Sequence, residues 1–163
     1  MPPSIRRAVA ADAAALTDLI NRAFRVEEFF VYGDRITLPE VEAFLERGEF
    51  LAIDAEQGLV GCVYLEIRSE RAYFGLLSID PARQRAGIGR RLIEAAEARA
   101  RERGCAYMDL QIVNLREELP EFYERLGYRV TGEAPFPEHV PTKLPCHFVK
   151  MSKLLVESLR DKG

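Results

Sequence analysis

A stretch of basic residues and glycines, residues 79–92, is the part of the sequence best suited to bind an anion. An apolar run ends at Ile79, Pro81 turns the chain, and Gly87 and Gly89 open a long amphipathic segment. Glycine lets the backbone approach a ligand closely, and the first N–H groups of a helix have no partner inside it. These groups and the helix dipole favour phosphate. Positive charge is added by Arg83, Arg85, Arg90 and Arg91.

Two familiar phosphate-binding motifs do not fit this stretch. A Walker loop requires Gly-Lys-Ser/Thr after its glycines, and a dinucleotide fingerprint requires a third glycine where Leu92 stands. The spacing Gln84-x-x-Gly87-x-Gly89 instead resembles the acyl-CoA-binding motif of the GNAT N-acetyltransferase superfamily. In that family the loop amides hold the CoA pyrophosphate, and the preceding strand pairs with the pantetheine arm. The resemblance implies that acetyl-CoA is bound by Leu77, Ile79, Gln84, Arg85, Ala86, Gly87, Ile88, Gly89 and Arg90.

A second motif follows the next strand. Residues 119–128, Leu-Pro-Glu-Phe-Tyr-Glu-Arg-Leu-Gly-Tyr, resemble the GNAT segment in which a tyrosine on a short helix precedes a Leu-Gly-aromatic turn. Tyr123 stands where the family places its general acid; the alternative is a tyrosine that only packs, with a structural hydrogen bond. Asn114 corresponds to a position that often contacts CoA, and its alternative is a turn residue at the end of a strand.

The reaction that the resemblance implies is acetyl transfer from acetyl-CoA to a primary amine of a small molecule or peptide. An alkylamine resembles lysine, with a pKa of about 10.4, so only about one molecule in a few thousand is a neutral nucleophile at pH 7. The departing thiol resembles cysteine, with a pKa of about 8.5, and leaves more readily when an acid such as tyrosine protonates it. The alternative is a non-catalytic acyl-CoA-binding or regulatory module that kept the loop and lost the chemistry.

The sequence does not single out a general base. Many family members carry a glutamate two residues before the position of Leu77, and this chain has Gly75 there. Glu66 and Glu28 are alternatives, acting directly or through water. Deprotonation by a chain of water molecules, or capture of the neutral amine, needs no base at all.

The resemblance also indicates where the acceptor binds. In family members the acceptor walls come from the loop after the first helix and the loop before the last strand, here residues 27–34 and 133–145. The first loop would suit a cationic amine with an apolar part, because it combines aromatic and acidic side chains: Phe29, Phe30, Tyr32, Glu27, Glu28 and Asp34.

The elements that must position these residues follow from hydrophobic periodicity. Helical spacing predicts a helix capped by Asp12, a second helix from Leu38, a long helix after Gly87 and a short one over residues 120–126. Apolar runs predict strands between these helices, with an antiparallel group leading through the long helix to a parallel crossover strand over residues 105–113. We therefore predict a single GNAT-like α/β domain over residues 1–163, with a mixed, mostly antiparallel central sheet flanked by helices.

The composition restricts the partners. A net charge of -3 argues against nucleic acid, because there is no broad basic excess. The three cysteines lack metal-ligand spacing, which predicts no metal site. The sequence contains no signal peptide and no apolar run of membrane-spanning length, so a cytoplasmic protein is expected. A homodimer is compatible with the resemblance, since some family members pair through sheet edges or C-terminal segments.

Overall fold

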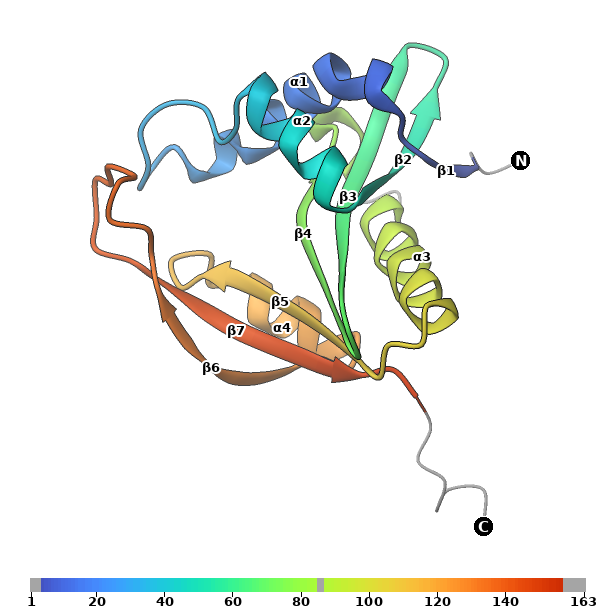
Figure 1. Ribbon diagram of the computed structural model, residues 1–163. Helices are drawn as coiled ribbons and strands as arrows, with labels where there is room; N and C mark the ends of the chain where they lie inside the picture. Colours follow the sequence, from blue (N-terminus) through green and yellow to red (C-terminus); the bar gives the residue numbers. More distant parts are fainter. Residues whose placement is uncertain (1–3, 85–86, 157–163) are drawn as a thin grey trace.

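A computed structural model describes residues 4–84 and 87–156. Its centre is a seven-stranded sheet in the order β1-β2-β3-β4-β5-β7-β6 (Figure 1). The strands are β1 (Ile5–Arg7), β2 (Glu49–Ala55), β3 (Gly58–Arg68), β4 (Arg71–Ile79), β5 (Tyr107–Val113), β6 (Arg129–Pro135) and β7 (His147–Leu154). The helices are α1 (Ala13–Ala23), α2 (Leu38–Arg47), α3 (Ile88–Glu102) and α4 (Leu119–Arg125). Only β4 and β5 pair in parallel among these strands, so the predicted mixed, mostly antiparallel α/β fold is confirmed.

Apolar side chains form a core on each face of the sheet. On one face, the predicted stripe of α3 is buried against β2 to β5, together with residues of α4. On the other face, Leu16, Leu19 and Ile20 of α1 pack with Val41 of α2 against the sheet. No helix within residues 4–84 and 87–156 is long and apolar enough to cross a membrane.

The first two helices begin with different polar contacts. Asp12 occupies the N-cap position of α1 as predicted, but its carboxylate makes no capping bond to the helix. It accepts a hydrogen bond from the N–H of Val9 at 2.7 Å and pairs with Arg6 at 2.9 Å, which holds β1 to the helix start. The second helix has a full capping box, in which the Glu40 carboxylate accepts from the N–H of Thr37 at 2.9 Å and Thr37 Oγ1 accepts from the N–H of Glu40.

The parallel strands β4 and β5 pair along only part of their length. The registered pairs run from Arg71 with Tyr107 to Tyr73 with Asp109. Beyond Tyr73 and Asp109, which we call the divergence point, β4 continues to Ile79 without a described strand partner on its β5 side. Figure 1 shows the two strands pointing away from each other, with β1 to β3 beside β4 and β7 and β6 beside β5. Part of the β4 backbone edge is therefore left for another partner.

A β-bulge in β4 decides which side chains face which helices. The register between β3 and β4 shifts by one residue, and Leu76 has a φ of 53°, in the left-handed region. As a result Tyr73 and Leu76 lie with the core of α1 and α2, whereas Phe74 and Leu77 lie with the core of α3. The end of β4 thus presents its apolar side chains to the start of α3.

Candidate functional site

The junction between β4 and α3 has the backbone geometry expected of an anion-binding loop. The Asp80 carboxylate accepts a hydrogen bond from the N–H of Ala82 at 2.9 Å and fixes the turn after the strand. Gly87 has a φ of 75° and caps α3, whose first backbone bond runs from the N–H of Arg91 to the carbonyl of Gly87 at 3.1 Å. The N–H groups of the preceding helical residues therefore have no partner within the helix. The predicted ligands Arg85 and Ala86 lie outside the described residues.

The end of β4 packs directly on the first turn of α3. A Cβ atom at Gly89 would lie 3.7 Å from Cδ1 of Ile79 and 4.0 Å from Cδ2 of Leu77. On the neighbouring strand, a Cβ atom at Gly61 would lie 2.8 Å from Cγ2 of Ile88, so this glycine allows the close approach of α3. Gly61 was missed as a positioning residue, although a glycine within an apolar strand is a signal of close packing.

The side chains of the remaining predicted loop ligands differ in burial and in their contacts. The side chain of Ile88 is buried in the core below the loop, so only its backbone faces the junction. Gln84 is exposed at the turn, and Arg90 pairs with Glu94 one helical turn away at 3.0 Å. The structure brings together five of the predicted ligands where the end of β4 meets the start of α3: Leu77, Ile79, Gly87, Ile88 and Gly89. Gln84 and Arg90 are exposed on either side of this junction in the sequence.

Tyr123 has a buried ring and a free hydroxyl. The residue is 5% exposed, and its ring centroid lies 5.0 Å from that of Phe122 and 6.0 Å from that of Phe74. Its hydroxyl makes no hydrogen bond to a described residue. Among the described residues, every side-chain oxygen or nitrogen that is fully shielded from solvent has a hydrogen-bond partner. The Tyr123 hydroxyl has no such partner and is therefore in contact with solvent. Burial raises the pKa of Tyr123, which keeps the phenol protonated at neutral pH.

The bonds of Asn114 are those of a residue at the end of a strand, and they leave its Nδ2 amide group without a partner among the described residues. Its Oδ1 accepts a hydrogen bond from the N–H of His147 at 2.8 Å, and its own N–H donates to the carbonyl of His147 at 2.9 Å. These bonds extend the β5–β7 pairing past the end of β5 and are structural. The Nδ2 amide group makes no hydrogen bond to a described residue and is free to donate to a ligand.

The two acids considered as bases, Glu66 and Glu28, lie in different places. Burial alone would raise the pKa of Glu66, but hydrogen bonds from Tyr64 at 2.6 Å and Arg68 at 2.5 Å outweigh it and hold that pKa below its usual value. Glu66 is therefore a weaker proton acceptor than a free carboxylate. Glu28 is exposed on the loop after α1.

Tyr73 is a site residue that the sequence reasoning missed. A Cβ atom at Gly75 would lie 2.7 Å from Oη of Tyr73, so the tyrosine ring fills the space that a side chain at residue 75 would need. The hydroxyl makes no hydrogen bond to a described residue, and burial raises the pKa of Tyr73. Residues two apart in a strand lie on the same face of the sheet. The pattern of a tyrosine two residues before a glycine could therefore have indicated that the ring lies over the glycine.

The two loops expected to form the acceptor walls do meet. Val31 forms an antiparallel bridge with Thr142, and the N–H of Lys143 donates to the carbonyl of Phe30 at 2.7 Å. Between them lies a hollow of about 280 Å³. Its lining carries cations as well as acids, and the charged members are Arg25, Glu28, Asp34, Arg35 and Lys143.

Two of the side chains assigned to this wall point inward instead. Phe30 is fully buried, and Glu27 is 7% exposed with its carboxylate 2.9 Å from Nη1 of Arg116. Because the ion pair neutralises Glu27 and the hollow contains three cations, the expectation of an acidic wall for a cationic amine is not supported by the charges present. The ion pair of Glu27 with Arg116 could not be predicted from the sequence, because the two residues are far apart in the chain.

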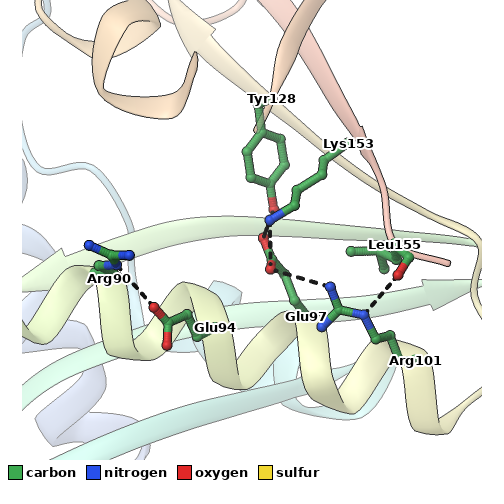
Figure 2. A network of polar contacts seen from close by, with 7 residues as sticks. All are labelled: Arg90, Glu94, Glu97, Arg101, Tyr128, Lys153 and Leu155. Atoms are coloured by element: carbon green, nitrogen blue, oxygen red, sulfur yellow. Dashed lines mark hydrogen bonds and ion pairs between the residues drawn. The ribbon is translucent and has the colours of Figure 1, made fainter. Parts of the chain in front are cut away.

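A buried carboxylate joins the two sequence motifs. Glu97 of α3 is 4% exposed and accepts hydrogen bonds from Oη of Tyr128 at 2.7 Å and Nζ of Lys153 at 3.0 Å. Figure 2 shows these side chains converging from the turn after α4 and from β7, with Arg101 completing the network and bonding the carbonyl of Leu155. The helix that carries the anion-binding loop is thus fixed to the turn that follows Tyr123.

Comparisons with known proteins agree with this geometry. Residues 46–130 match a family described as an acetyltransferase (GNAT) domain. Blasticidin-S acetyltransferase of Streptomyces morookaense is 38% identical over 91 residues, which are 55% of this chain and 59% of that relative. The match therefore spans little more than half of the curated relative.

Solved structures share the fold over nearly the whole chain. The ribosomal-protein-S18-alanine N-acetyltransferase of Escherichia coli has a TM-score of 0.78 at 16% identity, covering 95% of each chain. The yncA protein of Salmonella typhimurium, solved with acetyl-CoA, has a TM-score of 0.74 at 23% identity, covering 97% of this chain and 96% of that one. An aminoglycoside 6'-N-acetyltransferase solved with coenzyme A has a TM-score of 0.76 at 22% identity, covering 95% and 98%.

Proposed function

Because this chain belongs to the GNAT acetyltransferase family, we propose that it transfers an acetyl group from acetyl-CoA to a primary amine. The family match contains both sequence motifs, and the resemblance predicted from them is confirmed. The observation that carries the proposed activity is the edge of β4 that has no strand partner among the described residues and leads from the divergence point to the start of α3. Tyr123 lies beside this edge through the contact of its ring with Phe74.

The residues present fit acetyl-CoA as the co-substrate. N–H and C=O groups on the free edge of β4, between Phe74 and Ile79, would pair with the amides of the pantetheine arm. The N–H groups of Ile88, Gly89 and Arg90 would hold the pyrophosphate at the positive end of the α3 dipole. Bound there, acetyl-CoA supplies the acetyl thioester. The free amide of Asn114 is a further donor toward it.

Tyr123 is proposed to supply the proton that the leaving thiolate needs. Its phenol is neutral at pH 7, its hydroxyl has no structural hydrogen-bond partner among the described residues, and its ring is held by packing. These are the properties of a positioned general acid. The amine reacts as its neutral fraction, or loses its proton to water, because hydrogen bonds hold the pKa of Glu66 below its usual value and Glu28 lines the hollow between the loops rather than the edge of β4.

A thiol-release assay with acetyl-CoA and a panel of amines, amino acids and basic peptides tests this proposal. We expect release that depends on the acceptor and that Tyr123→Phe lowers by about 10²-fold or more in kcat, with the KM for acetyl-CoA almost unchanged. The control is Tyr107→Phe, which removes the hydroxyl of the first residue of β5, at the end of the strand that is farther along the chain from α4. Saturable acetyl-CoA binding without release from any acceptor would favour the non-catalytic acyl-CoA-binding module.

A further inference from the structure

A wide groove lies at the divergence point. It has a volume of about 640 Å³ and is lined from β3, β4, β5, β6, β7 and α2. Tyr73 and its strand partner Asp109 are both in the lining, as is Gln111 from the diverging part of β5. The groove therefore reaches the place where the free edge of β4 begins. The smaller hollow between the loops has no lining residue from β4 or β5.

The charges that line this groove are unbalanced. Its ionised side chains are four cations and two acids: Arg47, Arg68, Arg71, Lys150, Glu66 and Asp109. Each acid already has an arginine partner. Glu66 pairs with Arg68 at 2.5 Å, and Asp109 is bound through both oxygens by Arg71 at 2.6 and 2.8 Å.

The two remaining cations have no ion-pair partner among residues 4–84 and 87–156. The guanidinium of Arg47 lies 4.5 Å from the ring centroid of Phe44 and makes no hydrogen bond to a described residue, and Lys150 of β7 also lines the groove. An arginine fork and an ammonium group together match a carboxylate or a phosphate group. They repel a second cation on the same ligand.

We propose that this groove is the acceptor site and that the acceptor carries an anionic group, a carboxylate or a phosphate, in addition to its amine. The inference rests on the proposed function and names its substrate class. The amine lies at the inner end, where the neutral hydroxyl of Tyr73 accepts a hydrogen bond from it and turns the nitrogen toward the edge of β4. The anionic group lies at the outer end between Arg47 and Lys150.

Four amines with the same three-carbon chain test the substrate class. We compare kcat/KM for 3-aminopropylphosphonate, 4-aminobutanoate, propylamine and 1,3-diaminopropane, in which the same three carbon atoms carry the amine at one end and a phosphonate, a carboxylate, a hydrogen atom or a second amine at the other. We expect the better of the two anionic amines to exceed propylamine about tenfold or more, and the diamine to be the poorest. Which anionic amine is better distinguishes a phosphate site from a carboxylate site. A rate for propylamine or the diamine that equals or exceeds both would overturn the anionic site while leaving the transferase intact.

Variants locate the effect in the groove. The double substitution Arg47→Met and Lys150→Met keeps the apolar stems and removes both charges. We expect it to raise the KM of the anionic amines about tenfold or more and to leave propylamine unchanged. Arg103→Met, an exposed arginine after α3 that does not line the groove, is the matched control. An equal loss with every amine would point to a structural effect and reject the assignment.

A binding measurement separates this inference from the proposed activity. Inorganic phosphate is titrated into the protein with saturating CoA present, so that the α3 junction is occupied, and the rise in Tm is followed. Saturable binding that the double variant loses would support the groove even if no amine were acetylated, in which case the transferase proposal alone would fail. The same phosphate response in both proteins would overturn the groove.

Discussion

The hydroxyl oxygen of Tyr73 lies 2.7 Å from the point that a Cβ atom at residue 75 would occupy. The next contacts of that point are two carbon atoms of the same ring at 3.1 Å. Gly75 is therefore needed for the tyrosine to lie flat along β4 beside the groove. A glutamate at residue 75 would need the space that the hydroxyl of Tyr73 occupies, so this strand carries either the carboxylate or the tyrosine hydroxyl at this place.

Gly75→Ala is expected to displace the ring of Tyr73. Overpacking of this kind costs about 1–3 kcal/mol, and we expect the KM for the amine to rise while the KM for acetyl-CoA stays nearly constant. In a Tyr73→Phe background the closest clash is gone, so the added cost of the alanine should be smaller. Urea unfolding of the four proteins in this cycle gives the coupling. Strictly additive free energies would show that the hydroxyl does not occupy this space.

The pH dependence follows from the amine and from Tyr123. The neutral fraction of an alkylamine rises about tenfold per pH unit below its pKa of about 10.4. Burial raises the pKa of Tyr123, so its acid form, which is present below that pKa, persists to higher pH than in a free phenol. We expect kcat/KM for the amine to rise from pH 7 to 9 with no falling limb in that range. A fall centred below pH 9 would require a different acid.

Glu97 should be far more important for stability than its neighbour on the same helix. Replacing it by alanine leaves Lys153 without its buried partner, and we expect a loss of about 3–5 kcal/mol in the free energy of unfolding. Tyr128→Phe removes one hydrogen bond of 2.7 Å and should cost about 1–3 kcal/mol.

The control for this network is one helical turn earlier in Figure 2. Glu94 pairs with Arg90 at 3.0 Å, but both side chains are more than half exposed. An exposed pair of this kind contributes about 0.3–0.5 kcal/mol, so Glu94→Gln should change the urea midpoint little. Equal losses for the two glutamate variants would contradict the burial of Glu97 as the cause.

The two glycines of the anion-binding loop should respond differently to alanine. Gly87 has a φ of 75° with no atom near its missing side chain, so Gly87→Ala costs backbone strain of about 1–2 kcal/mol and should weaken CoA binding. At Gly89 an added methyl group meets only ordinary contacts, the nearest at 3.7 Å. Calorimetric titration with CoA and thermal unfolding of both variants check this order. Equal stability losses would argue against the left-handed turn at Gly87.

The features that the sequence predicted are those set by local chemistry. The turn at Gly87, the stripe of α3 and the short helix of Tyr123 each depend on neighbouring residues, and all lie close to where they were expected. Features that depend on distant pairings were missed. The burial of Glu27 requires Arg116, which is 89 residues away, and the ring of Tyr73 reaches the groove because β4 diverges from β5 at that point.

The brief parallel pairing of β4 with β5 also has a consequence for the order of folding. Strands β2, β3 and β4 are joined by short turns, so their contacts are local and close quickly. The pairing of β4 with β5 must wait until α3 has crossed the sheet. Only the pairs from Arg71 to Tyr73 then join the two strands, and we call this short paired segment the seam. We expect amide protons at this seam to become protected from exchange late in refolding. The place where β4 and β5 diverge would thus be where the two halves of the sheet are joined last.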